Sequence, residues 1–141
     1  MKELFTNLTT INSTTEVIQE ILKKPQHLLE WVPDIEVINT SNNQFHIARN
    51  ASALNQHEVL TITATSTTIT YHSTRGRLEC DLIFKISAAA DTTIVEQTLF
   101  LSDDTALPLP VTLLAPFAKH AFKQNLNTLK NLAERSVSQH F

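Results

Sequence analysis

Histidine ligates metals and transfers protons near neutral pH, so the histidines are the first candidates for chemistry in this sequence. The six histidines are at positions 27, 46, 57, 72, 120 and 140. Only His27 has a potential co-ligand at helical spacing, Glu30 three residues later, and two weak ligands do not close a metal site. No nucleophile elbow or similar catalytic motif accompanies any histidine. We therefore expect no metal site, and we interpret His27 with Glu30 as a solvent-facing capping interaction.

The single cysteine and a pair of adjacent aspartates are further candidates for reactive groups. Cys80 cannot form an internal disulfide or a multi-thiolate metal site, because the chain contains no second cysteine. It lies on the apolar face of an alternating strand segment, so we expect a buried, inert thiol with a raised pKa. Asp103 and Asp104 are neighbours in a loop, where adjacent carboxylates seldom converge on one atom, and we expect both to be solvated.

Three polar residues in the strand-forming part of the sequence are candidates for groups that point into the interior. Arg49 and Tyr71 each share one face of a strand with apolar residues. Glu96 lies in residues 92–101, whose two faces are both half apolar, so its direction stays open. If Glu96 lies near Arg49, the pair could orient a polar ligand head or polarise a carbonyl, since a buried charge needs a partner. The alternative is that Arg49 reaches the rim and Glu96 faces water.

Length and composition limit the classes of protein in which these residues can act. The chain has 141 residues, of which 42% are hydrophobic, enough for one domain over residues 1–141 with a buried core. Its net charge of −3 at pH 7 argues against a basic nucleic-acid-binding face. The N-terminus has no secretory signal, and the longest apolar run, ALPLPVTLLAPFA, is too short and too rich in proline to span a bilayer. We expect a cytoplasmic protein with no stable membrane insertion.

The N-terminal part of the chain predicts a strand followed by two short helices. Residues 3–11 are rich in Thr, Phe, Leu and Ile, which favours a strand. Ser13 begins a capping-box sequence, so it is expected to be the N-cap of the first helix. The second helix, over residues 25–31, ends at Trp31, because Pro33 pushes the residue before it into extended geometry.

The middle of the chain predicts an antiparallel sheet. Short strand-forming segments are separated by polar turns, and connections this short allow only antiparallel neighbours. The expected strands cover residues 34–39, 43–50, 57–65, 67–74, 78–88 and 92–101. Gly76, the only glycine of the chain, lies in the turn before residues 78–88 and is expected to adopt positive φ there.

The C-terminal part of the chain changes to a helical period. An apolar stripe runs at helical spacing from Ala118 to Ala133, with charged residues on the other side. Pro116 either starts this helix or kinks a longer helix that begins near Pro110, and we favour the longer helix. Asn125 lies inside the apolar stripe, which makes it a candidate hydrogen-bonding group.

Two stretches of the sequence carry a resemblance to a known family. The segment TTEVIQEILKKPQHLLEWVPDIEVI resembles the first helix, break, second helix and Trp-Xaa-Pro strand entry of the START-like, or SRPBCC, superfamily. The segment FKQNLNTLKNLAER is similar to the closing helix of that superfamily, and the resemblance covers the whole chain. It implies an α+β helix-grip fold, in which a curved antiparallel sheet of about seven strands surrounds a long C-terminal helix. The implied order is one strand, two helices, six strands and one helix.

The resemblance also implies a cavity between the concave face of the sheet and the long helix. The expected ligand-binding residues of this cavity are Trp31, Phe45, Arg49, Tyr71, Phe84, Glu96, Phe117, Ala121 and Asn125. Trp31 has an alternative role as a core residue that stiffens the cavity wall.

Three functions are compatible with this resemblance. The first, which we favour, is non-catalytic binding or transport of a small hydrophobic molecule such as a lipid, an isoprenoid or a polyketide-like compound, with no cofactor. The second is a polyketide cyclase or aromatase, which requires Arg49, Tyr71 and Glu96 to converge on one point of the cavity. The third is an interaction or regulatory domain, including a homodimer, which requires exposed apolar residues on the outer face of the sheet or near Leu107–Leu114.

Overall fold

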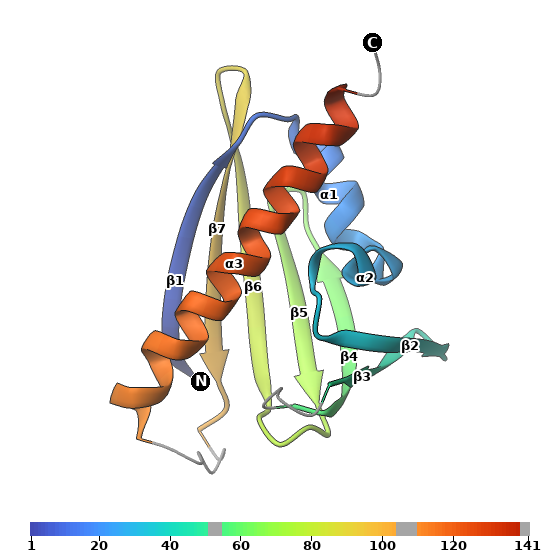
Figure 1. The fold of residues 1–141 in the computed structure, drawn as a ribbon, viewed down its shortest axis with the longest axis vertical. Helices are drawn as coiled ribbons and strands as arrows, with labels where there is room; N and C mark the ends of the chain where they lie inside the picture. Colours follow the sequence, from blue (N-terminus) through green and yellow to red (C-terminus); the bar gives the residue numbers. More distant parts are fainter. Residues whose placement is uncertain (51–54, 104–109, 139–141) are drawn as a thin grey trace.

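The computed structural model describes residues 1–50, 55–103 and 110–138. Within these ranges it contains one antiparallel sheet of seven strands in the order β1-β7-β6-β5-β4-β3-β2, with a long helix across it (Figure 1). The strands are β1 (Lys2–Ile11), β2 (Ile35–Ser41), β3 (Gln44–Arg49), β4 (His57–Ala64), β5 (Thr68–Thr74), β6 (Cys80–Ala89) and β7 (Thr92–Leu101). The helices are α1 (Thr15–Lys23), the 3₁₀ turn η1 (Pro25–His27), α2 (Leu28–Trp31) and α3 (Val111–Ser138). The predicted order of elements and the α+β helix-grip architecture are confirmed.

Helix α1 has a different N-cap from the one that its sequence predicts. Thr14 has extended backbone geometry (φ −83°, ψ 159°), and its Oγ1 accepts a hydrogen bond from the backbone N–H of Val17 at 3.3 Å. Ser13 is buried instead, and its backbone carbonyl accepts a hydrogen bond from Thr93 Oγ1 at 2.8 Å. The assignment of the cap to Ser13 is therefore wrong. Both residue types can cap a helix, and the contact with β7 decides between them.

The two short helical segments are delimited by prolines. Pro25 opens η1, where its missing N–H is not needed, and α2 follows directly. Val32 is extended (φ −119°, ψ 92°), because Pro33 disfavours helical geometry in the residue before it. Trp31 is consequently the last residue of α2, and it is only 2% exposed.

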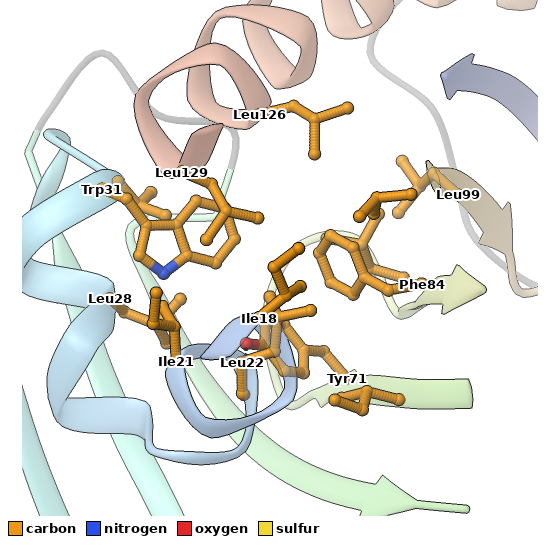
Figure 2. Packing of buried hydrophobic residues seen from close by; sticks show 14 of the residues in the cluster. Ile18, Ile21, Leu22, Leu28, Trp31, Tyr71, Phe84, Leu99, Leu126 and Leu129 are labelled. Atoms are coloured by element: carbon orange, nitrogen blue, oxygen red, sulfur yellow. Dashed lines mark hydrogen bonds between the residues drawn. The ribbon is translucent and has the colours of Figure 1, made fainter. Parts of the chain in front are cut away.

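The hydrophobic core lies where α1, α2 and the second half of α3 meet the inner face of the sheet (Figure 2). Trp31 packs edge-on against Phe84 of β6, with ring centroids 6.1 Å apart and ring planes at 76°. Tyr71 of β5 packs against the same Phe84 ring at 5.2 Å. Edge-to-face aromatic pairs stabilise by about 0.5–1.5 kcal/mol beyond the area that they bury. Large side chains therefore fill this end of the molecule.

Helix α3 continues through Pro116, which confirms the longer of the two predicted helices. It lies diagonally across the sheet and is tied to the edge strand β1 (Figure 1). Nδ2 of Asn7 donates to the backbone carbonyl of Lys119 at 3.0 Å, and Nζ of Lys123 donates to the backbone carbonyl of Leu8 at 2.6 Å. These bonds hold the first half of α3 over the β1 side of the sheet. No helix in the described ranges is both long and apolar enough to cross a membrane.

The turn between β5 and β6 has its positive φ at another residue than expected. Arg75 adopts φ 59°, and the φ of Gly76 is not positive. The prediction for Gly76 is therefore wrong. Gly76 instead has the side chain of Asn55 packed against it.

Candidate functional site

A cavity of about 500 Å³ separates the first half of α3 from the inner face of the sheet. Ligand-binding pockets typically measure about 300–1,000 Å³, so the volume suits a small organic molecule. Its apolar lining residues are Leu4, Leu60, Leu78, Leu82, Leu99, Leu101, Leu114, Phe117, Ala118, Ala121 and Phe122. Its polar lining residues are Asp34, Arg49, Asn55, Glu58, Tyr71, Ser73 and Cys80.

Both walls of the cavity include some small side chains. Ser73 of β5 and Cys80 of β6 are register partners on the sheet side. On the helix side, Ala118 and Ala121 line the cavity. In the core, by contrast, β6 contributes the large ring of Phe84. Protein interiors are otherwise close-packed, so small residues on two facing layers leave space for a guest.

One part of the cavity wall carries an ionic cluster, formed by the buried Glu58 and the half-buried Arg49 and Asp34. Nε of Arg49 donates to Oε1 of Glu58 at 2.8 Å, and Nη2 lies 2.7 Å from the same oxygen. Nη1 donates to Oδ1 of Asp34 at 2.9 Å. Burial disfavours the charged guanidinium, yet the pKa of Arg49 is raised, because the charges and hydrogen bonds of Glu58 and Asp34 outweigh burial. The guanidinium is therefore a permanent cation held by two carboxylates.

The second carboxylate oxygen of Glu58 is held by two further residues. Nδ2 of Asn55 donates to Oε2 at 3.3 Å, and the hydroxyl of Ser73 donates to the same oxygen. Asn55 is itself fixed by the backbone of Leu78, donating to the carbonyl at 2.8 Å and accepting from the N–H at 2.7 Å. The Glu58 side chain is only 4% exposed. Its carboxylate is held by Arg49 of β3, by Ser73 of β5 and by Asn55, which precedes β4.

Two weak acids line the cavity beside this cluster. Burial raises the pKa of the Cys80 thiol to about 12, and the negative charge of Glu58 adds to the shift. Burial likewise raises the pKa of Tyr71, whose hydroxyl donates to the backbone carbonyl of Leu22 at 2.6 Å. Both groups are protonated at neutral pH, and the half-buried Cys80 thiol has the raised pKa that its strand position predicts.

The structure brings some of the predicted ligand-binding residues together. Those that line the cavity are Arg49, Tyr71, Phe117 and Ala121. Trp31 and Asn125 line a second pocket of about 40 Å³, which shares Arg49 and Tyr71 with the cavity. The indole N–H of Trp31 has no hydrogen-bond partner in the described part of the chain.

The other predicted residues lie elsewhere. Phe84 is fully buried in the core, and Phe45 is half-buried and packs against the same core. Glu96 is on the outer face of β7, because its neighbours Val95 and Gln97 are fully buried on the inner face. These three residues do not line the cavity.

The three polar residues that a cyclase-type centre requires do not converge. The guanidinium of Arg49 is bound to Glu58 and Asp34, and the hydroxyl of Tyr71 is directed to the end of α1. Glu96 lies on the opposite face of the sheet. This arrangement does not support the cyclase hypothesis built on these residues.

Sequence reasoning missed Asp34, Asn55 and Glu58. A signal for Glu58 was present, since it alternates with Leu60 and Ile62 along β4 and so shares their inward face. Asp34 and Asn55 precede their strands and have no periodic signal. Their roles follow only from strand pairing, which places β3 beside both β2 and β4.

The remaining chemical candidates lie at the surface. Nδ1 of His27, the last residue of η1, lies 3.2 Å from Oε1 of Glu30 in α2. His27 is the N-cap residue of α2, but its side chain makes no capping hydrogen bond, so the predicted capping interaction is wrong and the contact is an exposed side-chain pair. Within the described ranges, no group of three or more His, Cys, Asp or Glu side chains could hold a metal ion. Asp103 is exposed and accepts a hydrogen bond from the N-terminal ammonium at 3.1 Å, and Asp104 lies outside the described residues.

The chain resembles known proteins in structure and not in sequence. No sequence model of a protein family and no curated protein sequence matches the chain. Its structure matches a START superfamily protein from Mycobacterium smegmatis, with a TM-score of 0.75, 16% identity, and coverage of 93% of this chain and 97% of that one. The chain has a START-like fold.

Two further solved structures share the START-like fold. Ara h 8.0201 matches with a TM-score of 0.67 and 13% identity, over 92% of this chain and 95% of that one. The Aha1 dimer from Colwellia psychrerythraea matches with a TM-score of 0.66 and 14% identity, over 95% and 97% of the two chains. At these identities the likeness shows the START-like fold alone, so function must be argued from the cavity itself.

Proposed function

We propose that this START-like chain binds a small hydrophobic molecule, such as a lipid, an isoprenoid or a polyketide-like compound, in the cavity under α3 and does not transform it. The observation that carries the proposal is a cavity of about 500 Å³ lined mainly by leucine, phenylalanine and alanine, with its charged groups at one end. Apolar walls stabilise an apolar guest because they remove its surface from water. A few placed polar groups then set its orientation.

The expected affinity follows from the area that such a guest would bury. Removing roughly 300 Å² of apolar ligand surface from water is worth about 7 kcal/mol at about 25 cal/mol per Å². Loss of translational and rotational freedom opposes binding, so we expect dissociation constants on the order of micromolar. Titrations in that range are therefore the appropriate measurement.

Two measurements on the purified protein test the proposal. Native mass spectrometry of freshly purified chain should show a mass increment from a co-purified guest. Titration with N-phenyl-1-naphthylamine, an uncharged probe that fluoresces in apolar surroundings, should show one saturable site per chain.

A matched pair of variants places the site. Leu82 lines the cavity, whereas the next residue of β6, Ile83, is half-buried on the outer face. Leu82→Trp should fill the cavity and weaken probe binding by about tenfold or more, because the guest and the indole compete for the same space. Ile83→Trp should leave probe binding unchanged. If Leu82→Trp folds and binds the probe as wild type does, or if wild type binds neither probe nor guest, the proposal is wrong.

Self-association and a cytoplasmic location stay predictions. Of the segment Leu107–Leu114, residues 107–109 lie outside the described part of the chain, Leu113 is exposed, and Leu114 is buried in the cavity wall. Light scattering of the purified chain tests the homodimer, since a strict monomer excludes it.

A further inference from the structure

We propose that the cavity selects its guest by the charge of the head group: it accepts a hydrogen-bond-donating head, a hydroxyl or an amine, and rejects an anionic one. The inference rests on the proposed function, because it names the class of ligand for the same cavity. Its basis is the balance of charges in the wall. Among the described lining residues, one cation, Arg49, faces two anions, Asp34 and Glu58.

The acceptor sites of Glu58 are largely used by its neighbours. A carboxylate offers about four acceptor sites. The carboxylate of Glu58 has Nε and Nη2 of Arg49 on one oxygen, and Asn55 and Ser73 on the other. Glu58 therefore has little capacity left for a ligand, and its role is to hold Arg49 in place.

Asp34 is the carboxylate of the cluster with acceptor capacity left. Within the described part of the chain, its carboxylate accepts one hydrogen bond, from Nη1 of Arg49 at 2.9 Å. Its side chain is 35% exposed, and it lines the cavity. A hydroxyl or an ammonium at this end can donate to Asp34, whereas a carboxylate or a phosphodiester has no proton to donate.

The sign of the electrostatic potential favours the same selection. With two carboxylates against one guanidinium, the cluster carries a net negative formal charge, and charges that are partly removed from water interact more strongly than charges in bulk water. An anionic head would meet net repulsion, and a cationic head net attraction.

Three amphiphiles of equal chain length test the selection: 1-decanol, decylamine and decanoate. Each is titrated as a monomer against bound N-phenyl-1-naphthylamine at pH 8 and low salt, where the amine is cationic and the acid anionic. We expect decanol and decylamine to bind at least about tenfold more tightly than decanoate. Desolvation alone would penalise amine and acid alike, so the ratio between these two ligands decides.

A charge-neutralising variant and its matched control locate the effect. Asp34→Asn removes the negative charge next to Arg49, and it should reduce the amine-to-acid affinity ratio by about fivefold or more. Asp91→Asn makes the same change in net charge at the exposed turn between β6 and β7, at the other end of the sheet from the turn between β5 and β6 (Figure 1). That variant should leave the ratio unchanged.

The outcomes separate this inference from the proposed function. If wild type binds decanoate as tightly as decylamine or more tightly, or if Asp34→Asn leaves the ratio unchanged, the inference is overturned and the proposed function stands. If none of the three amphiphiles and no probe binds, both are overturned. Should Asp34→Asn not fold, the amine-to-acid ratio of wild type decides alone.

Discussion

The backbone of Gly76 packs directly against the side chain of Asn55. A Cβ added to Gly76 would lie 2.8 Å from Cγ and 2.9 Å from Nδ2 of Asn55, closer than such atoms approach without displacement. Asn55 cannot move away freely, since its amide is bonded to Leu78 on one side and to Glu58 on the other. The only glycine of the chain therefore helps to position the carboxylate at the polar end of the cavity.

Gly76→Ala should lower the free energy of unfolding by about 1–3 kcal/mol, because the added methyl group displaces a hydrogen-bonded amide. The φ of Gly76 is not positive, so alanine meets no left-handed backbone strain there. Urea denaturation measures the change, and Asn55→Ala supplies the control background. With Asn55 truncated, Gly76→Ala should have little effect. An equal loss in both backgrounds would show that the contact is not the reason for glycine at this position.

Most of the fold could be predicted from the sequence because it depends on local signals. Pro25 and Pro33 delimit the short helices through their own backbone restrictions, and the alternation in strands such as β6 is a property of neighbouring residues. The two local errors are the N-cap of α1 and the residue with positive φ in the turn between β5 and β6. The backbone carbonyl of Ser13 is bonded to a residue of β7, and Thr14 caps α1 instead. The positive φ of the β5–β6 turn lies at Arg75 and not at Gly76.

The polar end of the cavity was less predictable because its members come from separate segments. Arg49 was expected inside, but its partner was sought in Glu96 and not in Glu58. Only the register between β3 and β4, which sets Ile47 opposite Glu58, shows that Arg49 and Glu58 are neighbours. Periodicity gives the face of a residue, and register gives its partner.

Replacing one partner of the Arg49–Glu58 pair should destabilise the fold more than replacing both partners. Arg49→Leu leaves Glu58 buried without its cation and should lower the free energy of unfolding by about 3–5 kcal/mol. The double variant Arg49→Leu/Glu58→Leu should recover much of this loss, because no buried charge remains in need of that partner. A double-mutant cycle by guanidinium denaturation measures both.

The exposed ion pair of Lys24 with Glu20 in α1 gives the surface control for this cycle. Lys24→Ala should leave the free energy of unfolding nearly unchanged, since water screens such pairs. If Arg49→Leu lowered the free energy of unfolding as little as Lys24→Ala does, the burial of Glu58 beside Arg49 would be contradicted.

The raised pKa of Cys80 predicts a loss of stability in alkali. Burial holds the thiol protonated in the folded chain up to a pKa of about 12, whereas in the unfolded chain it ionises near its ordinary value of about 8.5. Above that value the unfolded state binds fewer protons, so the free energy of unfolding falls by up to about 1.4 kcal/mol per pH unit. Below it, the contribution of Cys80 does not depend on pH.

Comparison of wild type with Cys80→Ala isolates this effect, because Tyr71 and all other groups titrate in both proteins. The difference in free energy of unfolding should be constant between pH 6 and pH 8. Between pH 9 and pH 11, the free energy of unfolding of wild type should fall steadily relative to that of Cys80→Ala. A constant difference over the whole range would show that the thiol is not protected by burial.

Phe117 should control how fast a guest leaves the cavity. It is 73% exposed, near the start of α3, and yet it lines the cavity, so its ring borders both water and the interior. Such an exposed ring contributes little to folding, and Phe117→Ala should change the free energy of unfolding by less than about 0.5 kcal/mol. The same change removes apolar contact from the guest, and we expect the lost contact to be worth roughly 1 kcal/mol or less. The dissociation rate of N-phenyl-1-naphthylamine should therefore rise several-fold.

Leu113 supplies the matched control, since it lies one helical turn earlier, is 54% exposed and is not part of the cavity lining. Stopped-flow measurement should find Leu113→Ala indistinguishable from wild type, and Phe117→Leu, which keeps most of the apolar area, between wild type and Phe117→Ala. If both alanine variants accelerated release equally, the effect would belong to the apolar surface of α3 in general. A difference confined to Phe117 would instead place the exit of the guest at the first turns of α3.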